Sequence, residues 1–156
     1  MKPLLNAAVA MAVSSAGLVA TPIAQGRGAD KMATVKALSC TFTTMAAGDW
    51  NAAGAVGAIK NATLSIRFTD IDADEGTAIA VGAFGPSDII VRLSFGTLHL
   101  VQSFREGPLY ATAVFPHELK PDVMRAVHTR HEYTTISLPG FTSRPEQYYG
   151  ECAINK

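Results

Sequence analysis

The densest group of side chains able to do chemistry lies at residues 128–132, which read His-Thr-Arg-His-Glu. The β-branched neighbours favour an extended strand. In a strand, His128, Arg130 and Glu132 face one way while His131 faces the other. This alternation keeps the two histidines from sharing one metal ion, so no metal site is predicted. We expect a polar outer face, on which Arg130 or His128 pairs with Glu132.

A second group of polar residues, 70–76, reads Asp-Ile-Asp-Ala-Asp-Glu-Gly and begins like a calcium-binding loop. It departs from that pattern twice, because the sixth position is Glu75 instead of glycine and the twelfth is Val81 instead of glutamate. A solvated acidic turn is therefore expected. Neither a Gly-x-Ser-x-Gly nucleophile motif nor a glycine-rich phosphate loop occurs. The sequence thus predicts a non-enzymatic protein without a cofactor.

The chain has two cysteines, Cys40 and Cys152, one in the first and one in the last predicted strand. Each shares a strand face with apolar neighbours. Two cysteines in an exported protein most often pair, so we predict a Cys40–Cys152 disulfide that makes the first and last strands neighbours. Two buried free thiols are the alternative.

Export is predicted from residues 1–26, which have the form of a cleaved signal peptide. Lys2 provides a positive start, and residues 4–20 are almost entirely apolar or small. A membrane anchor is the alternative, although the apolar run is short and interrupted for a spanning helix. A periplasmic or secreted protein without a membrane span after cleavage is expected. Small residues offer three cleavage points, after Ala20, Ala24 or Gly26.

Composition indicates one globular domain. The chain has 156 residues, of which 48% are hydrophobic and 17% charged, and its formal net charge is zero. A neutral chain has no general attraction to the phosphates of nucleic acids, so a nucleic-acid partner is not expected. After the leader, residues 27–36 have little to bury and are predicted to be flexible. Residues 37–156 form the predicted domain.

The domain is predicted to be all-β. Period-two alternation and turn residues at intervals of 9 to 12 residues favour an antiparallel meander of about eight strands that closes into a small up-and-down barrel. Residues 45–60 are expected to form a loop in which Trp50 covers one end of the core. Residues 116–125 and 137–147 are the other long loops. The predicted strands are 37–44, 63–69, 77–84, 88–95, 98–104, 109–115, 126–135 and 148–154.

Three short stretches carry a resemblance to a known group. They are Tyr-Tyr-Gly-Glu-Cys at 148–152, Ser-Cys-Thr-Phe at 39–42 and Ala-Val-His-Thr-Arg-His at 126–131. With the leader, they resemble small exported bacterial proteins of uncharacterised function, which implies no activity. The general plan is similar to calycin-type barrels, which include lipid carriers and protein inhibitors. Gly48-Asp49-Trp50 has the Gly-x-Trp spacing of many lipocalins but follows the first strand instead of opening it. The likeness is one of fold, which does not determine function.

Two functions from different classes follow from this plan. The first is a binding module that holds a small apolar or amphipathic ligand inside the barrel. Small side chains expected to face inward would leave the space, although they could instead let the walls approach closely. These side chains are Ala78, Ala80, Gly82, Ala111 and Ala113.

The second function is a protein-interaction module, such as a hydrolase inhibitor, that acts through the loops at 116–125 and 137–147. Phe141, Arg144 and Tyr148 are its candidate anchors, because aromatic and arginine side chains dominate binding energy at interfaces. Trp50 is a further candidate for binding a ligand or partner. The alternative is that Phe141 and Tyr148 plug the end of the barrel.

Overall fold

The computed structural model describes residues 27–83, 85–105, 107–136 and 141–155. The predicted signal peptide, residues 1–26, lies outside the described residues. One helix, α1 (Arg27–Thr34), precedes the strands. The strands are β1 (Leu38–Asn51), β2 (Gly54–Asp72), β3 (Thr77–Gly82), β4 (Gly85–Ser94), β5 (Thr97–Ser103), β6 (Leu109–Lys120), β7 (Val123–Arg130) and β8 (Glu146–Ile154).

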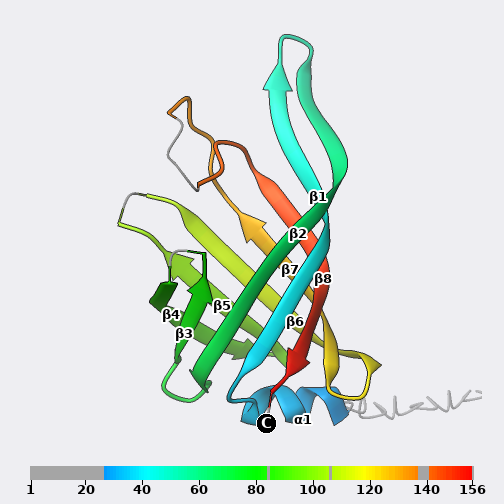
Figure 1. Cartoon of the computed structure of the whole chain (residues 1–156), viewed down its shortest axis with the longest axis vertical. Helices are drawn as coiled ribbons and strands as arrows, with labels where there is room; N and C mark the ends of the chain where they lie inside the picture. Colours follow the sequence, from blue (N-terminus) through cyan, green and yellow to red (C-terminus); the bar gives the residue numbers. More distant parts are fainter. Residues whose placement is uncertain (1–26, 84, 106, 137–140, 156) are drawn as a thin grey trace, which may run out of the picture.

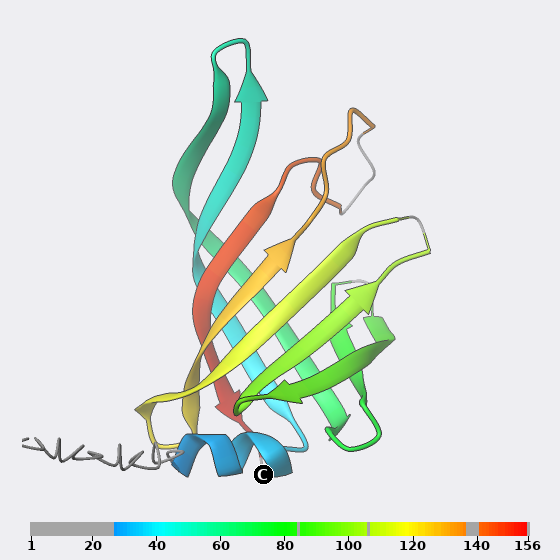
Figure 2. The ribbon, with the colours of Figure 1, turned by 180° about the vertical axis from the view of Figure 1, so that it is seen from behind.

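The strands form a single antiparallel sheet in meander order (Figure 1; Figure 2). Each strand pairs with the next, and β8 pairs with β1, so the ring of hydrogen-bonded neighbours is complete. The predicted all-β meander of about eight antiparallel strands is confirmed. The described part of the chain contains no helix with the length and apolar character needed to cross a bilayer.

The core lies inside the ring because alternate residues of each strand point inward. In β1, Leu38, Cys40 and Phe42 are buried while Ser39 and Thr41 between them are exposed. Burying each large apolar side chain contributes about 1.5–3 kcal/mol. The other strands add further apolar residues to this core, among them Phe68, Ile71, Val91, Leu98, Leu100, Val114 and Met124.

Helix α1 covers one end of the ring (Figure 1). Met32 is fully buried and Val35, just after the helix, is 5% exposed, so both belong to the core. Lys31 Nζ makes ion pairs with Glu118 and Asp122, at 2.5 and 2.7 Å, beside the β6–β7 turn. The prediction that residues 27–36 have little to bury was wrong. Met32 and Val35 lie three positions apart, so their side chains fall on one side of α1 and its end, and this side is buried.

The β1–β2 hairpin extends well beyond the other strands (Figure 1). Its register continues without interruption from Met45↔Lys60 to Asn51↔Gly54. The loop predicted for residues 45–60 is therefore wrong. Backbone pairing holds this hairpin together with both faces largely exposed, so its sequence shows no alternation of apolar and polar residues. Trp50 is 54% exposed on the hairpin and does not cover the core.

The predicted loop at residues 116–125 is also wrong, because β6 continues to Lys120 and β7 begins at Val123. The turn between them places Asp122 at φ 61°. Pro116 lies where the β6–β7 register breaks, between Val114 and Glu118. Since no ladder bond is needed there, the missing proline N–H is tolerated inside a strand. Strand β7 ends at Arg130, and residues 131–145 connect it to β8.

Candidate functional site

A cavity of about 290 Å³ lies inside the ring at the end away from α1. Helix α1 contacts the β6–β7 turn, whereas the cavity meets these two strands at Tyr110 and Arg130, near their opposite ends. Its apolar wall is formed by Leu64, Ile66, Ala80, Gly82, Ala83 and Phe104. Its polar lining consists of Thr63, Ser65, Gln102, Tyr110, His128 and Arg130.

The polar end of the cavity is built by two neighbouring strands. The antiparallel register places Tyr110 of β6 opposite Arg130 of β7, and Thr112 opposite His128. Thr112 and His128 are each 2% exposed and Tyr110 is 6% exposed, so this polar face points into the ring. The predicted polar outer face was therefore wrong. Strand alternation groups His128 with Arg130 correctly, but it does not say which face meets the interior.

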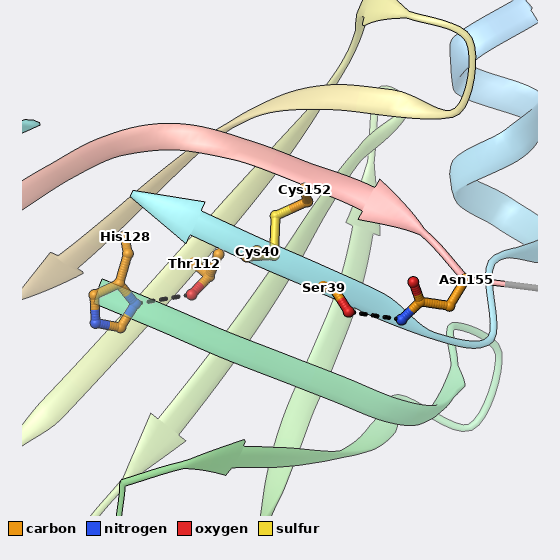
Figure 3. The surroundings of a disulfide bond; sticks show 6 residues. All are labelled: Ser39, Cys40, Thr112, His128, Cys152 and Asn155. Atoms are coloured by element: carbon orange, nitrogen blue, oxygen red, sulfur yellow. Dashed lines mark hydrogen bonds between the residues drawn. A yellow bond between two sulfur atoms is a disulfide. The ribbon is translucent and has the colours of Figure 1, made fainter. Parts of the chain in front are cut away.

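His128 is the most deeply buried polar group of the site. Its Nδ1 lies 2.9 Å from the Thr112 hydroxyl oxygen, and its Nε2 has no partner among the described residues (Figure 3). Aromatic rings of Phe42, Tyr110 and Tyr148 surround it, with centroids 5.6–5.9 Å away. Burial, helped by the positive charge of Arg130, lowers the pKa of His128 to about 3. His128 is therefore neutral at neutral pH.

Arg130 lies between two aromatic rings. Its guanidinium carbon is 4.9 Å from the Tyr110 ring centroid and 5.0 Å from that of Tyr148. Its only ion pair among the described residues joins Nη1 to Glu146 Oε2 at 3.7 Å. The Tyr148 hydroxyl donates to the same Glu146 oxygen at 2.6 Å. The predicted anchor Tyr148 is thus 8% exposed and part of the interior.

Four buried side-chain atoms of this region have no hydrogen-bond partner in the described structure: Tyr110 Oη, His128 Nε2, Arg130 Nε and Glu132 Oε2. The other Glu132 oxygen accepts a hydrogen bond from the Leu109 backbone N–H at 2.9 Å, and burial raises the pKa of this carboxyl group. Leaving a buried polar atom unpaired costs about 1–3 kcal/mol. Their concentration at one place, beside a cavity, is typical of a ligand site.

Phe141 packs at the cavity end of the ring. Its ring centroid lies 5.1 Å from Phe104, which in turn lies 4.9 Å from Tyr110, both in edge-on contacts. Phe104 and Tyr110 line the cavity. The structure therefore places Phe141 of the connecting segment 131–145 behind the cavity wall.

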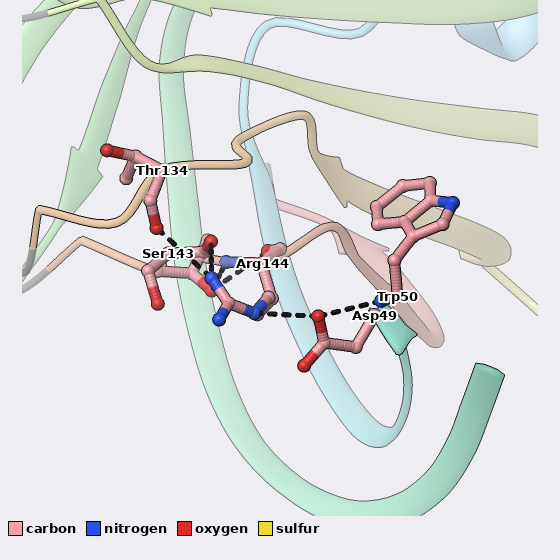
Figure 4. A network of polar contacts seen from close by, with 6 residues as sticks. Asp49, Trp50, Thr134, Ser143 and Arg144 are labelled. Atoms are coloured by element: carbon pink, nitrogen blue, oxygen red, sulfur yellow. Dashed lines mark hydrogen bonds and ion pairs between the residues drawn. The ribbon is translucent and has the colours of Figure 1, made fainter. Parts of the chain in front are cut away.

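Arg144 and Trp50 lie away from the cavity, in a surface network that links the β1–β2 hairpin to the connecting segment (Figure 4). Arg144 Nε pairs with Asp49 Oδ1 at 2.9 Å, and its Nη1 donates to the backbone oxygens of Thr134 and Ser143. The Trp50 backbone N–H donates to Asp49 at 2.8 Å. This bond, together with Arg144, lowers the pKa of Asp49.

The predicted inward-facing small residues divide into two groups. Ala78 and Ala80 are buried inside the ring, and Gly82 lines the cavity. Ala111 and Ala113 alternate with the inward-facing Thr112 and point outward, so the prediction was wrong for these two. Sequence reasoning also missed Tyr110 and Thr112. The available signal was their spacing of two, which matches that of His128 and Arg130.

No cluster of three or more His, Cys, Asp or Glu side chains within the described ranges is arranged to hold a metal ion. In the acidic turn, Asp72 Oδ1 accepts the backbone N–H groups of Asp74 and Glu75, at 3.0 and 2.9 Å. No protein-family model, curated protein or solved structure matches the chain. The geometry of the interior is therefore the basis of the functional argument.

Proposed function

We propose that this protein is a non-catalytic binding module, a small closed barrel that holds a small amphipathic ligand in its interior. The observation that supports it best is the cavity, which has an apolar wall and, at one end, buried polar atoms that lack partners. Its volume of about 290 Å³ is at the small end for ligand sites. At roughly 30 Å³ per water-sized group, it holds about ten non-hydrogen atoms. Calycin-type barrels, which the sequence resembles, are built on this plan.

Binding is favoured over catalysis by the position of the one hydroxyl–imidazole pair in the cluster. Thr112 contacts His128 at 2.9 Å, but it lies behind the histidine and does not line the cavity. A nucleophile must reach the reacting atom, and Thr112 does not.

The test is to fill the cavity. Gly82→Leu and Ala80→Leu place bulk on the cavity wall, and a Cβ at Gly82 would meet nothing within 4 Å. Ala111→Leu on the outer face of β6 is the matched control. Native mass spectrometry of the exported protein should show a small-molecule adduct for the wild type and Ala111→Leu, and a bare mass for both filled variants. An adduct that persists in the folded Gly82→Leu and Ala80→Leu variants would contradict an interior site.

An exported location is part of the proposal. The Cys40–Cys152 disulfide supports it, because such bonds persist in oxidising compartments such as the bacterial periplasm. A fusion of residues 1–36 to a fluorescent reporter that folds in either compartment would test it, with fluorescence confined to the cytoplasm as the contrary result.

Protein interaction is the second candidate, favoured by one feature of β2. Among the described residues, β2 pairs with β3 only from Arg67 onward, which leaves residues 54–66 with one unpaired edge. Ile59 on this stretch is 80% exposed, and Lys60 is its only charged residue. Such an edge accepts an extended segment of a partner as an added strand. Substituting the exposed Ile59 by Lys should then abolish partner capture while leaving ligand binding in the cavity intact.

A further inference from the structure

The hydrogen-bonding needs of Arg130 restrict where a ligand can approach it. A guanidinium has five N–H donors, all in one plane. The rings of Tyr110 and Tyr148 pack against this group, with centroids 4.9 and 5.0 Å from its carbon. Because the N–H donors point outward in the plane, new hydrogen bonds to a ligand form at its edges.

The Nη1 edge of the guanidinium faces the Glu146 carboxylate, and the Nε edge has no partner in the described structure. Nη1 lies 3.7 Å from Glu146 Oε2, which is too long for a direct hydrogen bond. Nε is buried and has no partner in the described structure. In any arginine, the Nε and Nη2 hydrogens point the same way and form a fork that matches the two oxygens of a carboxylate. Arg130 lines the cavity, and no described residue uses the Nε side of this fork.

Two further donors lie beside Arg130. The Tyr110 hydroxyl is buried and its hydrogen has no acceptor in the described structure, and Tyr110 lies directly opposite Arg130 on β6. The Thr112 hydroxyl oxygen and His128 Nδ1 share a hydrogen bond of 2.9 Å, and His128 Nε2 has no partner in the described structure. In the tautomer in which Thr112 donates to Nδ1, Nε2 carries the ring hydrogen and is a donor without an acceptor, in a residue that lines the cavity.

We propose that the interior ligand is a small amphipathic acid whose carboxylate is bound by Arg130, with Tyr110 and His128 as additional donors. The proposal rests on the binding function argued above. The apolar wall, with Leu64, Ile66 and Phe104, accommodates the hydrocarbon part. Glu146 does not compete for the free fork, because it lies at Nη1 and also accepts the Tyr148 hydroxyl.

The experiment compares three probes of one chain length: octanoate, 1-octanol and octyl phosphate. Isothermal titration calorimetry of the disulfide-bonded protein, freed of co-purified ligand, should show octanoate binding at least tenfold more tightly than octanol and octyl phosphate. Arg130→Gln should remove this preference, because it should lower the affinity for octanoate much more than the affinity for octanol. Arg125→Gln, an exposed arginine on the same strand, is the matched control and should behave like the wild type.

Tyr110→Phe keeps the ring over the guanidinium and removes only the hydroxyl. This variant should lower the affinity for octanoate severalfold without changing the affinity for octanol. If Arg130→Gln does not fold, Tyr110→Phe tests the carboxylate assignment in its place. Equal affinity for octanoate and octanol would overturn the carboxylate assignment while leaving the binding function intact. Preference for octyl phosphate would overturn it in favour of a phosphate group. Failure of all three probes to bind would contradict both proposals.

Discussion

Cys40 and Cys152 lie directly opposite each other on β1 and β8, with Cα atoms 4.0 Å apart, and their disulfide crosses the strand pair that completes the ring (Figure 3). The bond joins positions 112 residues apart. Restricting the unfolded chain over such a loop contributes up to about 4–5 kcal/mol in the chain-entropy model.

We therefore expect the Cys40→Ala, Cys152→Ala double variant to fold but to lose several kcal/mol of unfolding free energy. Urea unfolding followed by circular dichroism measures this, with the wild type in dithiothreitol as a second form of the same change. The backbone pairing of β1 with β8, continuous on both sides of the cysteines, remains in the variant. Identical unfolding curves for the oxidised and reduced protein would show that the bond is absent in solution.

Gly150 allows β8 to approach β1 closely. A Cβ at this position would collide with the Thr41 carbonyl oxygen and lie 2.7 Å from the Phe42 Cα, both backbone atoms. Because backbone cannot move aside as a side chain can, Gly150→Ala should lower the unfolding free energy by about 1–3 kcal/mol. Gly82→Ala is the control, since a Cβ there meets nothing within 4 Å, and it should be neutral or slightly stabilising. Equal effects of the two substitutions on chemical unfolding would refute this account.

His128 should make stability depend on pH. Its pKa in the folded protein is about 3, well below the ordinary value of 6.5. Between these values the unfolded chain binds a proton that the folded chain does not, so stability falls as pH decreases through 6.5. From pH 6.5 to pH 5 the loss is about 2 kcal/mol, at about 1.4 kcal/mol per pH unit.

The control for this pH dependence is His128→Gln, which cannot take up the proton. Other groups near His128 also titrate or carry charge. They are Arg130 and Glu132, which follow it along the chain, Tyr110 of β6 and Tyr148 of β8. They are present in both proteins, so the difference between the two urea-unfolding series isolates His128. Parallel pH profiles for the wild type and the variant would show that His128 is protonated normally.

Arg144 should matter locally and little for global stability. Its ion pair with Asp49 joins two side chains that are 38% and 45% exposed, and exposed pairs contribute little (Figure 4). We expect Arg144→Ala to leave the Tm nearly unchanged. It should speed amide exchange at Trp50, whose N–H donates to Asp49, and at Thr134, whose N–H donates to the Ser143 oxygen that Arg144 also contacts. Lys120→Ala, which removes another exposed ion pair, is the control.

The same variant tests the interaction hypothesis. Combined with Phe141→Ala, it should abolish capture of a protein partner if the connecting segment 131–145 is an interface. Phe141 packs edge-on against Phe104 at 5.1 Å, so its removal also thins the cavity wall. Intact partner capture by the folded double variant would exclude this segment as the interface.

The sequence alone was enough to predict the strands in which apolar and polar residues alternate. Over residues 38–42 of β1, apolar and polar residues alternate at every step because one face is buried. Burial also alternates in β4, although the exposed Ile90 interrupts the sequence pattern there. The same logic failed for the β1–β2 hairpin, whose β1 arm is half-buried and whose β2 arm is exposed at residues 54–61. Residues 45–60 were therefore predicted to be a loop, although backbone pairing holds them in register. Pro116 led to the wrong prediction of a loop at residues 116–125. A break in the β6–β7 register at this point means that the strand needs no backbone N–H from Pro116.

The pairing of Cys40 with Cys152 was predictable because only one intramolecular disulfide is possible with two cysteines. The candidate site was not. Sequence alternation placed His128 and Arg130 on one face of a strand, but only the closing of the ring decided that this face is the interior. The pairing of β7 with β6 and with β8 also brought Tyr110 and Tyr148 against Arg130. The environment of a side chain depends on which strands become its neighbours, and contacts between distant segments set that arrangement.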